Sequence, residues 1–144
     1  MKIDLEQHGY GEEDASFQAA GGQAGLEDLV ERFYRVMSEA PEAARIRAMH
    51  PDDLTVSSDK LTLFLCGWLG GPRLFQEKYG QIHIPGAHAH LEVGEEGRDA
   101  WLFCMERALE GVDYEEPFKR YLMRALAVPA ERIRLVAKDV PEIE

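Results

Sequence analysis

The sequence predicts an all-α domain. Apolar residues recur at helical spacing in four segments, which begin at Leu26, Leu61, Trp101 and Phe118. Between these segments lie glycines and prolines of the kind that end helices, as in Gly70-Gly71-Pro72 and at Gly111. A chain of 144 residues without an internal repeat fits one domain. We therefore expect a single domain over residues 13–144 that includes a short C-terminal extension, preceded by a loose polar extension at residues 1–12.

The composition argues against several classes of protein. The formal net charge is −11, which disfavours binding to the phosphate backbone of nucleic acid. No apolar run approaches the roughly 18 residues of a membrane-spanning helix, and the N-terminus has no apolar signal core. Cys66 and Cys104 are too few for a disulfide framework. We expect a cytoplasmic protein that binds neither membranes nor nucleic acid.

The first long helix is predicted by one apolar stripe, formed by Leu26, Leu29, Val30, Phe33 and Met37. Gly21-Gly22 breaks the chain before it, and Tyr34 lies beside the stripe. A short helix, PEAARIRAM, is predicted to start at Pro41 and to end at His50-Pro51.

The second strong stripe consists of Leu61, Phe64, Leu65 and Trp68. We expect Thr55, Ser57 or Ser58 to cap this helix, since their hydroxyls can accept from free backbone N–H groups. Gly70-Gly71-Pro72 should end it, and a shorter helix, PRLFQEKYG, should end at Gly80.

The segment from residue 81 to residue 97 has no helical period, and its glycines and prolines predict a loop. The next helix carries the stripe Trp101, Cys104, Met105, Ala108 and Leu109. Another helix is predicted from Pro117, with an apolar face of Phe118, Tyr121, Leu122, Ala125 and Leu126. The last segment, PAERIRLVAKDV, fits a short helix or, through the alternation in RIRLV, a strand.

The predicted loop carries three histidines, His83, His88 and His90. They can be solvent-exposed and inert, or three imidazole ligands of zinc or nickel, although no Cys, Asp or Glu stands at a standard spacing. One of them can instead be an axial haem ligand, which needs a single imidazole beside an apolar slot. The side chains that the helices offer for such a slot are Phe33, Leu61, Phe64, Phe75, Trp101 and Met105.

Five motifs, taken in order, resemble the group II truncated globins of bacteria. They are AAGGQAGLEDLVERFYRVM, MHPDDL, LTLFLCGWLGGP, YGQIHIPGAHAHLEV and RDAWLFCMERAL. The resemblance runs from about Phe17 to Leu126. It implies a truncated globin fold, which is a 2-on-2 helical sandwich around one haem.

The resemblance also implies the iron ligand. In this family the proximal histidine lies ten residues before the Arg of an Arg-Asp-Ala-Trp motif and thirteen before its Trp. Counting back from Arg98 and Trp101 gives His88. His83 and His90 are then not expected to bind iron.

On the other side of the haem, the resemblance makes Tyr34 and Trp101 donors to a bound ligand. His50 falls on the family's aromatic corner position, and Ser57 on the helix position that faces the ligand. The residues expected to contact the haem or line its pocket are Phe33, Ser57, Leu61, Phe64, Leu65, Phe75, Tyr79, His83, Trp101 and Met105.

One part of the family pattern is missing. Relatives often place arginines just before the proximal histidine, where they can pair with haem propionates, whereas this chain has Gly86 and Ala87. Lys78, Tyr79 and His83 are the candidates left for that role.

The resemblance implies haem b (iron protoporphyrin IX) that binds dioxygen and other diatomic ligands. No Cys-x-x-Cys-His motif is present, so we expect the haem to be held without covalent attachment. Several distal donors favour slow dioxygen release, which suits peroxide or nitric oxide chemistry with an electron-donating reductase. A dioxygen carrier, store or sensor is the alternative, and a helical adaptor without haem is the interpretation outside the family. The chain is expected to be a monomer or a homodimer.

Overall fold

The computed structural model describes residues 13–80 and 95–139, with side chains as far as residue 128. Helices make up all the regular structure in these ranges. An all-α fold is thereby confirmed for this part of the chain. The helices are α2 (Ala15–Ala19), α3 (Gly22–Glu39), α4 (Ala44–Ala48), α5 (Thr55–Trp68), α6 (Leu74–Tyr79), α8 (Glu95–Glu110) and α9 (Glu116–Asp139), with a 3-10 turn, η1 (Pro41–Ala43), before α4. None of the helices in these ranges is long and apolar enough to span a membrane.

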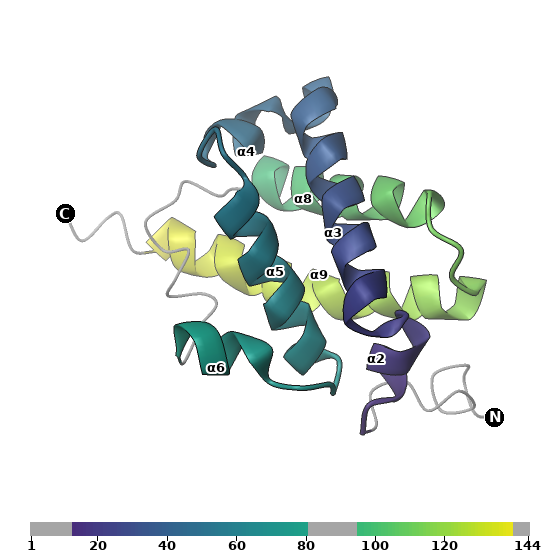
Figure 1. Ribbon diagram of the computed structural model, residues 1–144. Coiled ribbons are helices and arrows are strands. Elements are labelled where there is room, and N and C mark those ends of the chain that lie inside the picture. Colours follow the sequence, from purple (N-terminus) through teal and green to yellow (C-terminus); the bar gives the residue numbers. More distant parts are fainter. Residues whose placement is uncertain (1–12, 81–94, 140–144) are drawn as a thin grey trace.

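Two pairs of helices cross each other to form the domain (Figure 1). Helix α3 lies beside α5 in one layer, and α8 lies beside α9 in the other. The layers meet where α3 packs on α8, while the short helix α6 packs against α5. The largest fully buried side chains come from both layers and include Phe33, Met37, Leu65, Met105, Phe118 and Leu122.

Helix α3 buries the whole stripe that the sequence predicts. Leu26, Leu29, Phe33 and Met37 are each 0% exposed, and Val30 is 1% exposed. The glycine pair before the helix is required by the backbone, because Gly21 and Gly22 have φ values of 86° and 70°. These left-handed conformations are costly for a residue with a Cβ atom.

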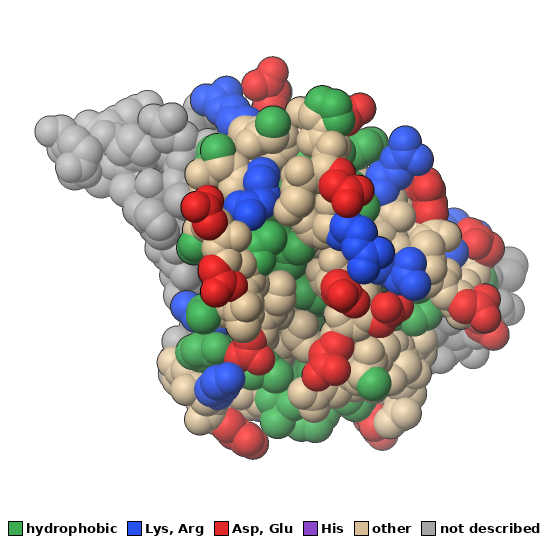
Figure 2. Space-filling view, turned by 45° about the horizontal axis from the view of Figure 1, so that its top comes forward, with side chains coloured by type: hydrophobic (Ala, Val, Ile, Leu, Met, Phe, Trp, Pro, Cys, Tyr) green, Lys and Arg blue, Asp and Glu red, His purple; other side chains and the backbone are tan. Residues whose placement is uncertain are grey.

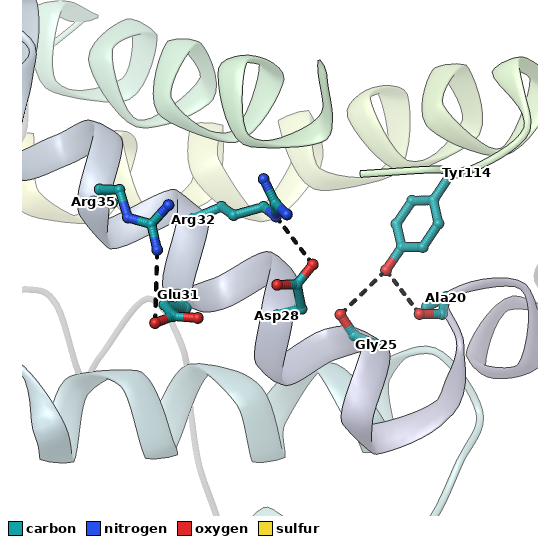
Figure 3. Close-up of polar contacts among 7 residues, drawn as sticks. All are labelled: Ala20, Gly25, Asp28, Glu31, Arg32, Arg35 and Tyr114. Atoms are coloured by element: carbon teal, nitrogen blue, oxygen red, sulfur yellow. Dashed lines mark hydrogen bonds and ion pairs between the residues drawn. The ribbon is translucent and has the colours of Figure 1, made fainter. Parts of the chain in front are cut away.

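The corner before α3 is hydrogen-bonded to the turn between α8 and α9. The Tyr114 hydroxyl donates a hydrogen bond to the Ala20 carbonyl oxygen at 2.7 Å and lies 3.5 Å from the Gly25 carbonyl oxygen (Figure 3). On the solvent side of the same helix, Asp28–Arg32 and Glu31–Arg35 form ion pairs one turn apart (Figure 3). Such exposed pairs contribute little to stability, so burial and the Tyr114 contact position α3.

The predicted capping of α5 is wrong. The helix begins at Thr55, and none of the three expected hydroxyls caps it. Leu54 is the N-cap residue, and the Oδ1 of the preceding Asp53 accepts the backbone N–H of Thr55 at 2.9 Å. At the other end, Gly70 has a φ of 96° and lies so close to the Glu13 carbonyl that a Cβ atom would sit 1.8 Å from its oxygen. The second glycine pair therefore ends α5 as predicted and lets the N-terminal segment pack against it.

Two predictions for the C-terminal half need correction. Helix α8 begins at Glu95, so residues 95–97 are helical and not part of a loop. Glu95 and Glu96 favour that start, because carboxylates interact well with the positive end of a helix. Helix α9 continues through Pro129 to Asp139, so the last segment is neither a strand nor a separate helix. Cys66 and Cys104 are free and fully buried, as expected of thiols in a core.

Candidate functional site

Four aromatic rings meet where α3, α8 and the corner after α4 come together. The Phe33 ring lies 4.9 Å from the Tyr34 ring and 5.0 Å from the Trp101 ring, between ring centroids. The Tyr34 ring in turn meets the His50 ring edge to face at 5.7 Å. The structure thus brings together the three residues expected to interact with a distal ligand, with Phe33 packed between two of them.

The polar groups of Tyr34 and Trp101 are not used in hydrogen bonds within the described part of the fold. Among the described residues, neither the Tyr34 hydroxyl nor the Trp101 indole N–H has a hydrogen-bond partner. Tyr34 is 8% exposed, and burial raises the pKa of its hydroxyl to about 12. The hydroxyl therefore keeps its proton at neutral pH and is available as a donor.

The tautomer of His50 follows from its neighbour. Nδ1 of His50 lies 2.8 Å from the Ile46 carbonyl oxygen, which can only accept. Nδ1 therefore carries a proton, and in the neutral ring Nε2 is left as an acceptor.

Helix α5 presents an open apolar face. Ser57, Leu61, Phe64 and Trp68 share one side of the helix, and each is half-buried. The Phe64 and Trp68 rings stack at 6.1 Å. Leu65, at the edge of this face, is 1% exposed, and Cys66, on the opposite side of α5, is 0% exposed, so both are packed in the core. Of the predicted contacts on this helix, Leu65 lies in the core, and Ser57, Leu61 and Phe64 lie on the open face.

The remaining predicted contacts fall into two places. Met105 is fully buried in the core, one turn beyond Trp101. Phe75 and Tyr79 lie on α6 with their ring centroids 5.1 Å apart, and Phe75 is 8% exposed. His83, with the proposed iron ligand His88 and with His90, lies outside the described residues. In the ranges that are described, no three His, Cys, Asp or Glu side chains gather as a metal site.

Helix α6 is tied to α5 through a carboxylate that the sequence did not single out. Asp59 accepts hydrogen bonds from Lys78 Nζ at 2.8 Å and from the Tyr79 hydroxyl at 2.6 Å. These two bonds hold the pKa of the Asp59 carboxyl below its usual value. Lys78 and Tyr79, expected as propionate contacts, are thus each engaged by Asp59. The contact fixes the end of α6, next to the segment that contains His88.

A cavity of about 600 Å³ lies between α3 and α5, away from the open apolar face of α5. Figure 2 shows a hollow of this kind, with hydrophobic side chains inside and charged side chains around it. Glu27, Glu31 and Asp59 line it from the two helices. Tyr34 is the one predicted site residue among its lining residues, so the cavity and the ring cluster meet at Tyr34.

Comparison with known proteins relates this geometry to a family. The bacterial-like globin family matches residues 15–134. A curated relative, the group 2 truncated hemoglobin YjbI of Bacillus subtilis (strain 168), is 31% identical over 120 residues, which cover 83% of this chain and 88% of the relative.

Solved structures agree in fold. A group II 2-on-2 hemoglobin from Agrobacterium tumefaciens is 34% identical, with a TM-score of 0.78 over 83% of this chain and 92% of that one. A truncated oxygen-avid haemoglobin from Bacillus subtilis is 31% identical, with a TM-score of 0.72 over 82% of this chain and 97% of that one. The crossed pairs α3–α5 and α8–α9 correspond to the 2-on-2 arrangement named in the first of these. The chain belongs to the bacterial-like globin family and is a group II truncated haemoglobin in fold.

Proposed function

We propose that the chain binds one haem b non-covalently, with His88 as the iron ligand, and holds dioxygen beside Tyr34, Trp101 and His50. Family membership implies the haem cofactor. The observation that carries the proposal is the ring cluster, in which the polar ends of Tyr34 and Trp101 have no partner among the described residues. Unused donors of this kind are what a partly negative ligand requires.

The described residues fit a haem on the distal side. A haem needs an apolar slot beside its ligand pocket. The half-buried face of Leu61, Phe64 and Trp68 supplies apolar side chains that the core leaves uncovered. Cys66 and Cys104 are fully buried and far apart in sequence, which supports a haem held without thioether bonds.

When bound, the haem supplies an iron site that coordinates a diatomic ligand, and the protein tunes how long the ligand stays. Tyr34 donates its O–H, and Trp101 its indole N–H, toward the ligand. His50 acts on Tyr34 through the edge-to-face contact of the two rings, with its Nδ1 held by Ile46. Each donated hydrogen bond is worth about 1–1.5 kcal/mol, or roughly a tenfold slower release.

Slow release favours redox turnover with peroxide or nitric oxide over simple carriage. Such turnover needs an electron-donating reductase, which we include in the proposal as a partner. A dioxygen store or sensor is the second candidate, and the solved relative described as oxygen-avid supports it equally.

The absorption spectrum of the purified protein is the first test. We expect a Soret band that shifts when the protein is reduced and exposed to carbon monoxide. A protein that neither contains haem nor takes it up would contradict the proposal and favour a helical adaptor. Dioxygen release and peroxide consumption, measured on the same sample, then separate the two functions. Slow release with turnover supports redox chemistry, and slow release without turnover supports storage or sensing.

A further inference from the structure

Arg47 joins three parts of the chain around His50. Its Nε donates to Ser38 Oγ at 3.1 Å, near the end of α3. Its two terminal nitrogens donate to consecutive backbone carbonyls, Nη1 to Pro51 at 3.0 Å and Nη2 to Asp52 at 3.1 Å. One guanidinium group therefore ties the turn that follows His50 to the helix that carries Tyr34.

Arg47 and His50 are also linked directly. The backbone N–H of His50 donates to the Arg47 carbonyl at 3.0 Å, and the ring Nδ1 is held by Ile46. Ser38 lies one turn after Tyr34 on α3, so the two residues share a face of that helix. The contacts of Arg47 thus join the corner that carries His50 to the part of α3 that follows Tyr34.

We propose that Arg47 is a positioning residue that holds His50 against Tyr34 and thereby sets the rate of ligand release. This inference rests on the proposed function, because release is the quantity that His50 influences. Among the described residues, the side-chain hydrogen bonds of Arg47 go to Ser38, Pro51 and Asp52 and to none of the four rings of the cluster. Arg47 acts only by holding the corner that carries His50 in place.

The three acceptors of Arg47, on Ser38, Pro51 and Asp52, can be bridged by an arginine side chain but not by a lysine. A planar guanidinium presents several N–H groups in a fixed fork, whereas a lysine ammonium is a single point of charge on a flexible stem. Lysine at this position can reach one of the three acceptors but cannot bridge all of them. Arg45 provides a matched control on the same short helix, because its side chain is 70% exposed and its one ion pair with the described residues is with Glu96, at 3.6 Å.

The test is a cycle of variants in the haem-loaded protein. Dioxygen release is measured for Arg47→Gln and Arg45→Gln, each in the wild-type background and in His50→Phe. Arg47→Gln should change release by roughly threefold or more, in the same direction as His50→Phe. In the His50→Phe background it should change nothing further, and Arg45→Gln should be silent in both backgrounds. Arg47→Lys gives the same test if the neutral variant does not fold.

A second measurement does not depend on ligand kinetics. Proton NMR of the carbon monoxide complex should show a cross-peak between the rings of Tyr34 and His50. The cross-peak should weaken in Arg47→Gln and persist in Arg45→Gln. If the protein contains no haem, the proposed function fails, and the same cross-peak in the haem-free protein still tests whether Arg47 positions His50.

Three results would overturn the role of Arg47. One is an unchanged cross-peak in Arg47→Gln. Another is an unchanged release rate in Arg47→Gln, whether or not His50→Phe alters release. The third is an equal effect of Arg47→Gln in both backgrounds, because Arg47 would then act through the fold as a whole and not through His50.

Discussion

The His50 ring meets the Tyr34 ring edge to face at 5.7 Å, while its Nδ1 is held by the Ile46 carbonyl at 2.8 Å. The Tyr34 hydroxyl is buried and has no hydrogen-bond partner among the described residues. The contact therefore places the corner after α4 against the residue whose hydroxyl is available to a bound ligand. The relationship leads to predictions about ligand release and about the dependence of stability on pH.

Removing a distal donor should speed dioxygen release. In Tyr34→Phe and in Trp101→Phe, release should be roughly tenfold faster, since each variant loses one hydrogen bond of about 1.4 kcal/mol. The double variant should depart from additivity, because both donors share one ligand. Stopped-flow measurement of dioxygen release gives these rates.

Carbon monoxide is the control for that prediction. It is a poorer hydrogen-bond acceptor than dioxygen, so its release should change much less in the same variants. An equal acceleration for both gases would show that the substitutions act by shape, since Trp101→Phe also shrinks the ring.

The His50 ring should influence dioxygen release through Tyr34. Its Nδ1 is held by the Ile46 carbonyl, and the ring meets the Tyr34 ring edge to face. His50→Phe keeps an aromatic ring but removes both ring nitrogens, so dioxygen release should change by roughly threefold or more. An unchanged release rate would mean that His50 does not take part in ligand stabilisation.

Buried Tyr34 should weaken the fold at alkaline pH. Burial raises the pKa of its hydroxyl from 10.0 to about 12, so between these values the unfolded chain loses the proton and the folded chain keeps it. The group costs nothing below its unfolded pKa, and the free energy of unfolding falls as the pH rises above it.

For a hydroxyl whose pKa is raised as that of Tyr34 is, the free energy of unfolding falls by roughly 1.3 kcal/mol between about pH 9 and about pH 11. Tyr34→Phe should lose less stability than wild type over that interval, as measured by denaturant unfolding at each pH. Parallel losses in the two proteins would contradict the pKa given for Tyr34.

The core was largely predictable from the sequence, because each stripe reflects burial on one side of one helix. The whole α3 stripe from Leu26 to Met37 is buried as predicted. The errors arise where a local signal competes with packing or with the helix dipole. Gly97 does not delay the start of α8 and Pro129 does not end α9, although both residues are poor helix formers.

The ring cluster was predicted only through the resemblance, since periodicity placed Tyr34 beside the stripe without giving it a role. Asp59 and Arg47 were not predicted at all. Asp59 meets partners 19 and 20 residues away, and Arg47 bonds to Ser38 nine residues before it. Contacts of this kind depend on how the helices pack, and no spacing in the sequence marks them.

The central claim is that His88 holds the haem iron, and comparing His88→Gly with His90→Gly tests it most directly. Haem content is measured from the absorption spectrum after gel filtration, with and without added imidazole. We expect His88→Gly to lose its haem and to regain it with imidazole, which can replace the missing side chain. His90→Gly should retain haem as wild type does. Loss of haem from His90→Gly, with His88→Gly unaffected, would contradict the account.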